Sequence, residues 1–382
     1  MSRSPLPFDA HADPALLADL AARLRATRWP PAAAAPAWVH GTDLLWLQSL
    51  CSDWIARIDG TGPVDDWSDR EHELVQIEDV SIHVVRGTSS KRRRDGIPLL
   101  LTHGWPSAFV EYLPALDMLT DPAAHGVTGP AFDVVLASLP GYGWSTRPDR
   151  AMTYAETARL WHVVMAELGY DRYGVGGGDF GSGVATMMAI QQPDRVIGLH
   201  LSTLELLPEV ADHDSLSTEE REWRQADQAH WTIDGGYKAI QSTRPQSLAY
   251  ALTDSPAGLA GWIGEKWHGW VEDPARLSAS PLREVLLDVL TLYWTTGCIG
   301  PSMRDYADNR LHPPSLDGAR IEVPTGIPLF ADPGGIPPRH HVERLYNVAH
   351  WQDVPHGGHF APAEAPRTFT GDICAFFAGL DI

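Results

Sequence analysis

Hydrophobic positions recur at helical spacing in two stretches near the start of the chain. One face of the first carries Leu16, Leu17, Leu20 and Leu24, and one face of the second, Asp43–Ile58, carries Leu44, Leu47, Leu50, Trp54 and Ile58. Asp13 followed by Pro14 is a typical helix start, and Trp29-Pro30-Pro31 would end the first helix. The pattern predicts a helical, proline-interrupted region over residues 1–75.

The pattern then changes to short apolar runs bounded by glycine and proline. They are Val75–Val85, Ile97–Thr102, Phe132–Ser138, Tyr173–Gly176 and Val196–Leu201. Helical stretches at Tyr154–Leu168 and Ser182–Gln191 alternate with them. Because such alternation is typical of parallel strands covered by helices, we expect residues 76–205 to form the first part of an α/β core.

Strand patterns vanish from Leu206 to Gly300, where helical spacing and tryptophan predominate. We expect an inserted helical cap over residues 206–300, with residues 301–382 completing the core through a strand at Ile327–Phe330 and a closing helix at Thr368–Leu380. The basic run Lys91–Arg94 lies between two strand candidates and predicts a solvated hairpin turn.

Charge and composition exclude several classes of function. Lys and Arg total 29 against 49 Asp and Glu, a formal net charge of −20 that repels phosphate backbones and anionic lipid, so we expect neither nucleic-acid nor membrane partners. The 3 cysteines show no ligand-like spacing, which argues against a disulfide framework and a zinc site. Because no stretch is typical of a signal peptide or a membrane span, we expect a cytoplasmic protein.

The sharpest motif is a glycine-rich turn between a strand candidate and a helix. Gly177-Gly178-Asp179-Phe180-Gly181 has the form of the nucleophile elbow of α/β-hydrolases, with Asp179 in the place of the usual serine. Glycines are needed there because the turn leaves no space for side chains. Two other readings stay open. Asp179 could merely cap the following helix, or the glycines could bind phosphate, although a central carboxylate would repel it.

Two more motifs follow the order that this fold requires. Thr102-His103-Gly104-Trp105-Pro106 ends a strand candidate, where α/β-hydrolases supply an oxyanion-hole N–H, and the backbones of Trp105 and Phe180 would be the donors. Gly357-Gly358-His359-Phe360 supplies a late histidine, and we favour His359 over His356 and His340-His341 because glycines flank it. An ordinary strand exit and a structural histidine are the plain alternatives.

Together these motifs resemble the α/β-hydrolase epoxide hydrolases of the microsomal and juvenile-hormone type, over nearly the whole chain. Further segments that carry the resemblance are Gly235–Pro245, Asp254–Ala260 and Leu292–Gly297. It implies an α/β-hydrolase fold with a helical N-terminal extension and an inserted helical cap. By position, it implies that Asp179 is the nucleophile and His359 the base, and that Tyr237 and Tyr306 protonate the epoxide oxygen.

Elementary chemistry agrees with these roles. A carboxylate with a pKa of about 3.9 is ionised at neutral pH and attacks carbon without a base. A phenol with a pKa of about 10 keeps its proton until an alkoxide forms. The family places an acid after a late strand, here near Val323–Gly334, where Asp332 is the sole acid but lies one position earlier than usual. Glu205 is the alternative acid, and no cofactor or metal is implied.

Two rival functions stay open. A haloalkane dehalogenase also forms an aspartyl ester but needs donors for a halide rather than phenols, and a relative could bind ligand without turnover. The Trp-rich cap, with His103 and Trp144 as substrate-binding residues, favours an apolar, aromatic epoxide, with that small molecule and water as partners. Composition suggests a bacterial source, with a role in detoxification or in secondary metabolism such as antibiotic biosynthesis. The oligomeric state is left open, with a homodimer as one option.

Overall fold

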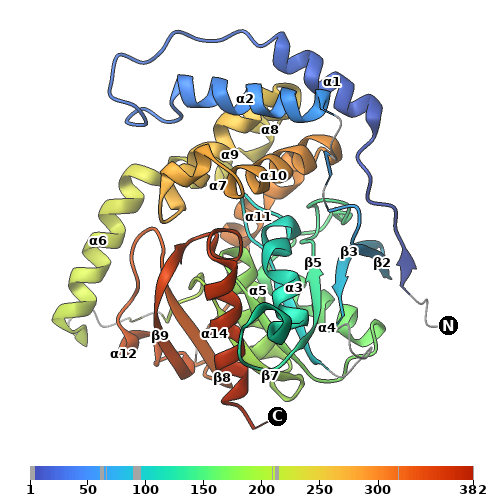
Figure 1. The fold of residues 1–382 in the computed structure, drawn as a ribbon. Coiled ribbons are helices and arrows are strands. Elements are labelled where there is room, and N and C mark those ends of the chain that lie inside the picture. Colours follow the sequence, from blue (N-terminus) through green and yellow to red (C-terminus); the bar gives the residue numbers. More distant parts are fainter. Residues whose placement is uncertain are drawn as a thin grey trace.

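The computed structural model describes residues 5–60, 64–65, 67–88, 96–208, 210, 215–316 and 318–381. Its centre is a nine-stranded sheet in the order β1-β2-β3-β5-β4-β6-β7-β8-β9 (Figure 1). The strands are β1 Leu6–Pro7, β2 Glu71–Ile77, β3 Val80–Gly87, β4 Ile97–Thr102, β5 Phe132–Ala137, β6 Tyr173–Gly177, β7 Val196–Leu201, β8 Ile321–Ala331 and β9 Tyr346–Gly358. The pairs β1–β2, β2–β3 and β3–β5 are antiparallel. The remaining pairs, β5–β4, β4–β6, β6–β7, β7–β8 and β8–β9, are parallel. The predicted α/β class is confirmed.

Helices cover the parallel part of the sheet on both faces. α3 (Leu113–Thr120) packs against α14 (Pro366–Ala378) in front of the sheet in Figure 1, and α4 (Tyr154–Glu167) packs against α5 (Phe180–Gln191) behind it. Every residue of β5 and β6 is therefore buried. This double cover explains why the central strands read as continuous apolar runs in the sequence.

The segment between β7 and β8 forms the helical cap. It contains α6 Thr218–Asp234, α7 Gly236–Thr243, α8 Pro245–Asp254, α9 Pro256–Trp270, α10 Leu282–Thr296 and α11 Ile299–Leu311. In Figure 1, α8, α9 and α10 lie above the sheet, and α6 runs down its left side. Helical structure thus continues past the boundary predicted at residue 300. The consequence is that Tyr306 belongs to the cap rather than to the core.

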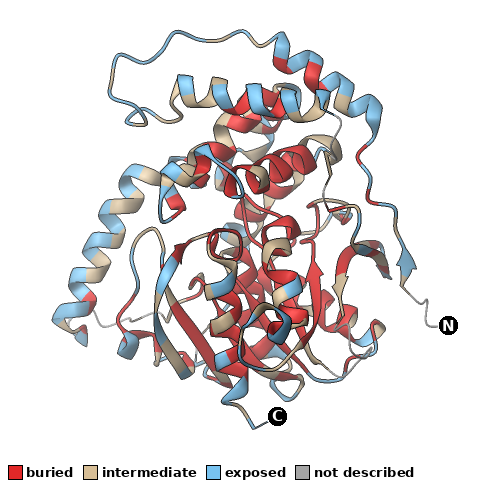
Figure 2. Ribbon diagram, viewed as in Figure 1, coloured by how far each residue is buried: buried red, intermediate tan, exposed pale blue. Residues whose placement is uncertain are grey.

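The two N-terminal helices pack on the cap. α1 (Pro14–Arg25) begins after Asp13, whose side chain accepts a hydrogen bond from Ala15 N, as the sequence predicts. α2 (Leu44–Asp59) lies against α9, and Trp54 Nε1 donates to Thr291 Oγ1 on α10 at 2.9 Å. The N-terminal region therefore braces the cap from outside, and burial is densest in the sheet and in α9 and α10 (Figure 2).

Two strand predictions need correction. The run Val75–Val85 is the hairpin of β2 and β3, and β2 already begins at Glu71, inside the region predicted as helical. β9 was not predicted, because it is the edge strand and its residues alternate irregularly between buried and exposed. An edge strand that is half in water lacks a continuous apolar run.

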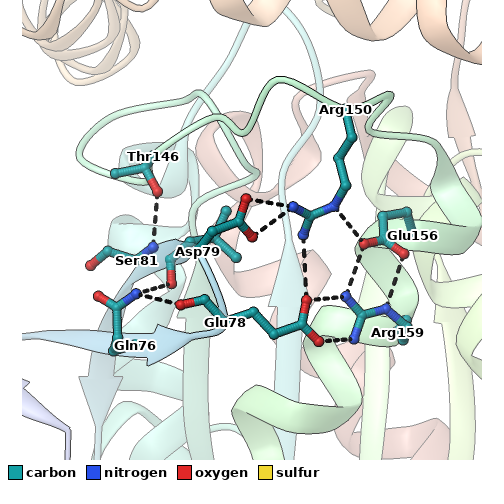
Figure 3. Close-up of polar contacts among 9 residues, drawn as sticks. Gln76, Glu78, Asp79, Ser81, Thr146, Arg150, Glu156 and Arg159 are labelled. Atoms are coloured by element: carbon teal, nitrogen blue, oxygen red, sulfur yellow. Dashed lines mark hydrogen bonds and ion pairs between the residues drawn. The ribbon is translucent and has the colours of Figure 1, made fainter.

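Ion pairs hold the β2–β3 turn against α4 (Figure 3). Arg150 bonds Asp79 at 2.6 Å and Glu156 at 3.1 Å, while Arg159 bonds Glu78 at 2.9 Å. Because these groups are largely exposed, each pair contributes little stability by itself. The predicted turn at Lys91–Arg94 lies outside the described residues. Within those described, no helix has the length and apolar content needed to cross a membrane.

Candidate active site

Asp179 stands at the sharp turn between β6 and α5. Its backbone has φ 50° and ψ −129°, a strained conformation of the kind that functional sites retain. The flanking glycines are required by close packing against β4. A Cβ on Gly181 would lie 1.9 Å from the Thr102 carbonyl oxygen, and one on Gly177 would lie 2.6 Å from the same atom. The turn therefore holds the Asp179 carboxylate above the ends of the parallel strands.

Two backbone N–H groups hold one oxygen of this carboxylate. Asp179 Oδ1 accepts hydrogen bonds from Trp105 N at 2.9 Å and Phe180 N at 2.7 Å. These are the two donors that the sequence suggests for an oxyanion hole. Gly104 leaves the space for this arrangement, since a Cβ there would lie 2.4 Å from Asp179 Oδ1. The second oxygen, Oδ2, is left to face other groups.

His359 lies between two carboxylates. Its Nε2 is 3.6 Å from Asp179 Oδ2, and its Nδ1–H donates to Asp332 Oδ1 at 2.6 Å. Asp332 reaches the ring although it stands one position early in sequence; it directly follows β8, and the loop beyond it turns at Gly334 and Gly335, which have positive φ values of 82° and 80°. Glu205, the alternative acid, instead accepts a hydrogen bond from Tyr154 Oη at 2.7 Å.

The charges of this group are mutually dependent. Burial by itself would lower the pKa of His359, but Asp332, aided by Asp179, outweighs burial and raises it to about 9. Burial raises the pKa of Asp179 to about 6, against the lowering effect of the His359 charge and of the two N–H donors. At neutral pH the resting site is therefore an ion pair of the Asp179 carboxylate with the His359 imidazolium.

Tyr237 and Tyr306 close the site from the cap. Tyr237 on α7 stacks on the Trp105 ring with centroids 5.3 Å apart, and Tyr306 on α11 meets the Phe180 ring edge-on at 4.8 Å. Their own ring centroids are 5.7 Å apart. The Tyr306 hydroxyl is buried and directed at the Tyr237 side chain, with which it shares a hydrogen bond. Burial, chiefly, raises the pKa of both phenols well above 10, so both keep their protons.

A cavity of about 220 Å³ joins these groups. Asp179, His359, Asp332, Tyr237 and Tyr306 all line it, so the structure brings together every predicted catalytic residue. Its other walls combine apolar and aromatic residues with polar ones. The apolar and aromatic residues include Leu204, Leu207, Trp223, Trp231, Trp270 and Ile336, and the polar ones are Ser202, Thr203, Glu205, Asp227 and Lys238. Among the described residues, no cluster of histidine, cysteine and acidic side chains is arranged to hold a metal ion.

Comparison with known proteins identifies the family. Residues 5–112 match the family described as epoxide hydrolase N terminus, and residues 97–234 match the alpha/beta hydrolase fold. The chain is 35% identical to a putative epoxide hydrolase of Stigmatella aurantiaca over 98% of this chain and 85% of that protein. It is 30% identical to epoxide hydrolase 1 of Oryctolagus cuniculus over 97% and 88%. The chain belongs to the epoxide hydrolase family.

Solved structures agree with this assignment. The structure of Aspergillus niger epoxide hydrolase superposes with a TM-score of 0.82 and 28% identity, covering 99% of this chain and 97% of that one. Juvenile hormone epoxide hydrolase from Bombyx mori superposes with a TM-score of 0.86 and 28% identity, covering 98% and 94%. The chain is therefore an epoxide hydrolase with the α/β-hydrolase fold, the first of the functions that the sequence left open.

The two predicted substrate-binding residues of this epoxide hydrolase lie away from the cavity. His103 is 1% exposed, and its ring bonds the backbone at Gly104 O (3.0 Å) and Leu139 N (3.2 Å). Trp144 packs against Phe8 and His83, with ring centroids 5.4 and 4.9 Å apart. That prediction is corrected: both residues support the fold beneath the site, because their loops turn toward β3 and the N-terminal strand.

Sequence reasoning also missed Lys266. This lysine on α9 is 2% exposed, pairs with Asp234 at 2.7 Å, and lies 4.6 Å from the centroid of the Tyr237 ring. A lysine placed within an otherwise apolar helix face was the available signal, since lysine is rarely buried without a partner.

Proposed function

We propose that this epoxide hydrolase opens its substrate through an ester on Asp179. The observation that carries the proposal is the orientation of the carboxylate: the N–H groups of Trp105 and Phe180 hold Oδ1, so Oδ2 is the oxygen free to attack. The buried phenols of Tyr237 and Tyr306 lie across the same cavity and supply O–H donors for the epoxide oxygen.

In the first step, Asp179 Oδ2 forms a bond to one epoxide carbon while the carbon–oxygen bond of the ring breaks. A tyrosine gives its proton to the alkoxide as it develops, which general acid catalysis makes faster by about 10²–10⁴-fold. Tyr237 and Tyr306 interact with each other in the free site, and an epoxide oxygen placed between them would accept hydrogen bonds from both hydroxyls.

In the second step, water hydrolyses the ester. Ester formation removes the negative charge of Asp179, which is one of the charges that raises the pKa of His359. The imidazolium can then give its proton to the tyrosinate that ring opening left, and the neutral imidazole acts as base while Asp332 holds its Nδ1–H. Water adds to the ester carbonyl carbon, the N–H groups of Trp105 and Phe180 hold the oxyanion, and collapse releases a vicinal diol.

The aromatic walls of the cavity favour an apolar aryl epoxide as substrate. Trp223, Trp231 and Trp270 supply flat apolar surfaces on the cap side of the cavity. The cytoplasmic location, the bacterial source and a role in detoxification or secondary metabolism stay predictions from composition, as does a homodimer.

The test is intact-protein mass spectrometry of the His359→Gln variant mixed with styrene oxide. We expect a stable adduct of one substrate mass, because the ester forms but is not hydrolysed, and no adduct in the Asp179→Asn control. Wild type should release the diol. An adduct that persists in Asp179→Asn would place the nucleophile elsewhere, and diol formation at the wild-type rate by His359→Gln would exclude His359 as the base.

A further inference from the structure

A second and much smaller cavity also borders the Asp179 carboxylate. Its volume of about 10 Å³ suits a single water molecule. It is enclosed by the HGWP loop and the elbow, and Ser107 and Glu111 supply its other polar side chains. Asp179 and His359 are the residues that line both this cavity and the large one. The nucleophile and base therefore stand between a substrate-sized space and a water-sized space.

The polar groups of the small cavity keep hydrogen-bonding capacity for a water. Ser107 is 1% exposed, and its hydroxyl faces the Glu111 carboxylate, which has more acceptor sites than this one contact uses. Glu111, in the short 3-10 helix Phe109–Tyr112, is 6% exposed, and within the described chain its carboxylate has no lysine or arginine at ion-pair distance. Since buried polar groups are nearly always satisfied by protein or by ordered water, this space is suited to a bound water.

We propose that Glu111 and Ser107 hold the water molecule that hydrolyses the Asp179 ester. This inference rests on the proposed function and gives the binding position of the water that takes part in its second step. The Glu111 carboxylate accepts one O–H of the water, and the neutral His359 Nε2 accepts the other, which directs the oxygen lone pair at the Asp179 ester carbon. Ser107 Oγ donates a hydrogen bond that fixes the water between them.

Atoms and charges balance in this step. The water oxygen bonds to the ester carbon, His359 Nε2 takes the proton, and the Trp105 and Phe180 N–H groups hold the oxyanion. The bond between the carbonyl carbon and the diol oxygen then breaks, and His359 returns its proton to that oxygen. Asp179 is left as the carboxylic acid, and its proton passes to His359 Nε2, which restores the resting ion pair. Because the water has a cavity of its own, the diol portion in the large cavity does not have to move to admit it.

Two charges of opposite sign act on Glu111 in the resting site. Burial, chiefly, raises the pKa of Glu111 to about 7; the His359 charge opposes this rise, and the smaller effect of the Asp179 charge adds to it. Glu364 is a further acid whose charge acts on this group. When the ester forms and His359 becomes neutral, both charges disappear and their effects on Glu111 largely cancel. The position of Glu111 in the small cavity, rather than a change in its charge, is what suits it to hold the water.

The test separates the two chemical steps of the Glu111→Gln variant. Enzyme in excess is mixed with styrene oxide at about pH 7.5. Samples are quenched in acid at increasing times, and the mass of the intact protein is measured by mass spectrometry. We expect ester formation within about twofold of wild type and ester hydrolysis slower by about tenfold or more, so that the adduct accumulates. Ser107→Ala should slow hydrolysis by a smaller factor with ester formation unchanged.

A pH profile adds a readout that a structural role would not move. Glu111 is one of the charges that raises the pKa of His359. In Glu111→Gln, the acid limb of the pH profile of ester hydrolysis should therefore shift to lower pH, because the pKa of His359 falls when this negative neighbour is removed. An unshifted limb combined with a lower rate would overturn the assignment.

Glu364→Gln is the matched control. Glu364 is also a buried acid near His359, but its oxygens accept hydrogen bonds from the Glu272 and Phe360 backbones and it does not line the small cavity. The Glu364→Gln variant should lower the stability of the folded protein without causing the Asp179 ester to accumulate. The inference fails if Glu364→Gln accumulates ester as Glu111→Gln does, or if both Glu111→Gln and Ser107→Ala hydrolyse the ester at the wild-type rate. Absence of any adduct even in His359→Gln would instead overturn the proposed function.

Discussion

Replacing Asp332 by asparagine should remove the charge that prepares His359 as a base. The Nδ1–H of His359 donates to Asp332 Oδ1 at 2.6 Å, and the His359 side chain is 10% exposed. A pKa of about 9 in place of the ordinary 6.5 means that the site favours the imidazolium by about 3 kcal/mol, since one pKa unit is ~1.4 kcal/mol. Burial acts in the opposite direction, so Asp332 contributes at least this much together with its charged neighbours.

The effect on the rate follows from both charge and geometry. An amide cannot offset the imidazolium charge, and it can also stabilise the tautomer that presents Nε2–H to the water. The equivalent change in a Ser-His-Asp triad lowers kcat by about 10⁴, so we expect ester hydrolysis in Asp332→Asn to fall by about 10³–10⁴. Ester formation should change much less, because the Asp179 carboxylate attacks without a base.

The assay is single-turnover mixing with styrene oxide, with the ester followed by intact mass and the diol by chromatography. Asp332→Asn should accumulate ester as His359→Gln does. Glu205→Gln is the control, since Glu205 lines the large cavity but bonds Tyr154 Oη. If Glu205→Gln accumulates ester while Asp332→Asn turns over normally, then Glu205 is the acid and the reasoning from the 2.6 Å contact is refuted.

Three further expectations follow from the contacts of single residues. Tyr237→Phe and Tyr306→Phe should each slow ester formation by about 10–100-fold, and the double variant should form no ester in stopped-time mass measurements, because the alkoxide loses both proton donors. Lys266→Met should slow ester formation by up to about thirtyfold, since a buried cation over the Tyr237 ring at 4.6 Å is worth ~2 kcal/mol; in a Tyr237→Phe background this change should largely vanish. Asp372→Asn should lower the free energy of unfolding in urea by about 2 kcal/mol at neutral pH without changing KM. Two buried histidine contacts outweigh burial and hold the pKa of Asp372 at about 2, so its contribution is present above about pH 4 and is lost as the pH falls toward 2. A variant as stable as wild type at neutral pH would contradict that assignment.

The positions of Asp179 and His359 in one site were predictable because their motifs follow from steric necessity, while their roles as nucleophile and base stay a proposal. A tight turn against β4 excludes side chains at Gly177 and Gly181, so the requirement appears in the sequence as glycine at these two positions. Chain order then places His359 after the nucleophile. The sequence could suggest Asp332 as the acid but could not establish it. A loop with glycines at positive φ can follow many different paths, and only the folded structure shows that the Asp332 carboxylate reaches the His359 ring.

Other features depend on packing that local sequence does not record. His103 and Trp144 stand next to functional motifs, yet their rings turn toward the protein interior, since neighbours in sequence need not face the same space. β9 escaped prediction because an edge strand mixes buried and exposed residues. Glu111 reads as one acid among apolar residues, and its position beside Asp179 becomes visible only when the 3-10 helix folds back over the elbow.

In the mechanism that we propose, the charge on Asp179 links the two chemical steps of this site. While Asp179 is ionised, it helps to keep His359 protonated, and the imidazolium in turn favours the carboxylate that must attack. Attack consumes that charge, so the condition that made Asp179 a nucleophile ends at the moment the ester exists. The same event lets the pKa of His359 fall and releases a base for the water. The ordering of the reaction therefore needs no conformational change, because each step alters the electrostatics in the direction that the next step requires.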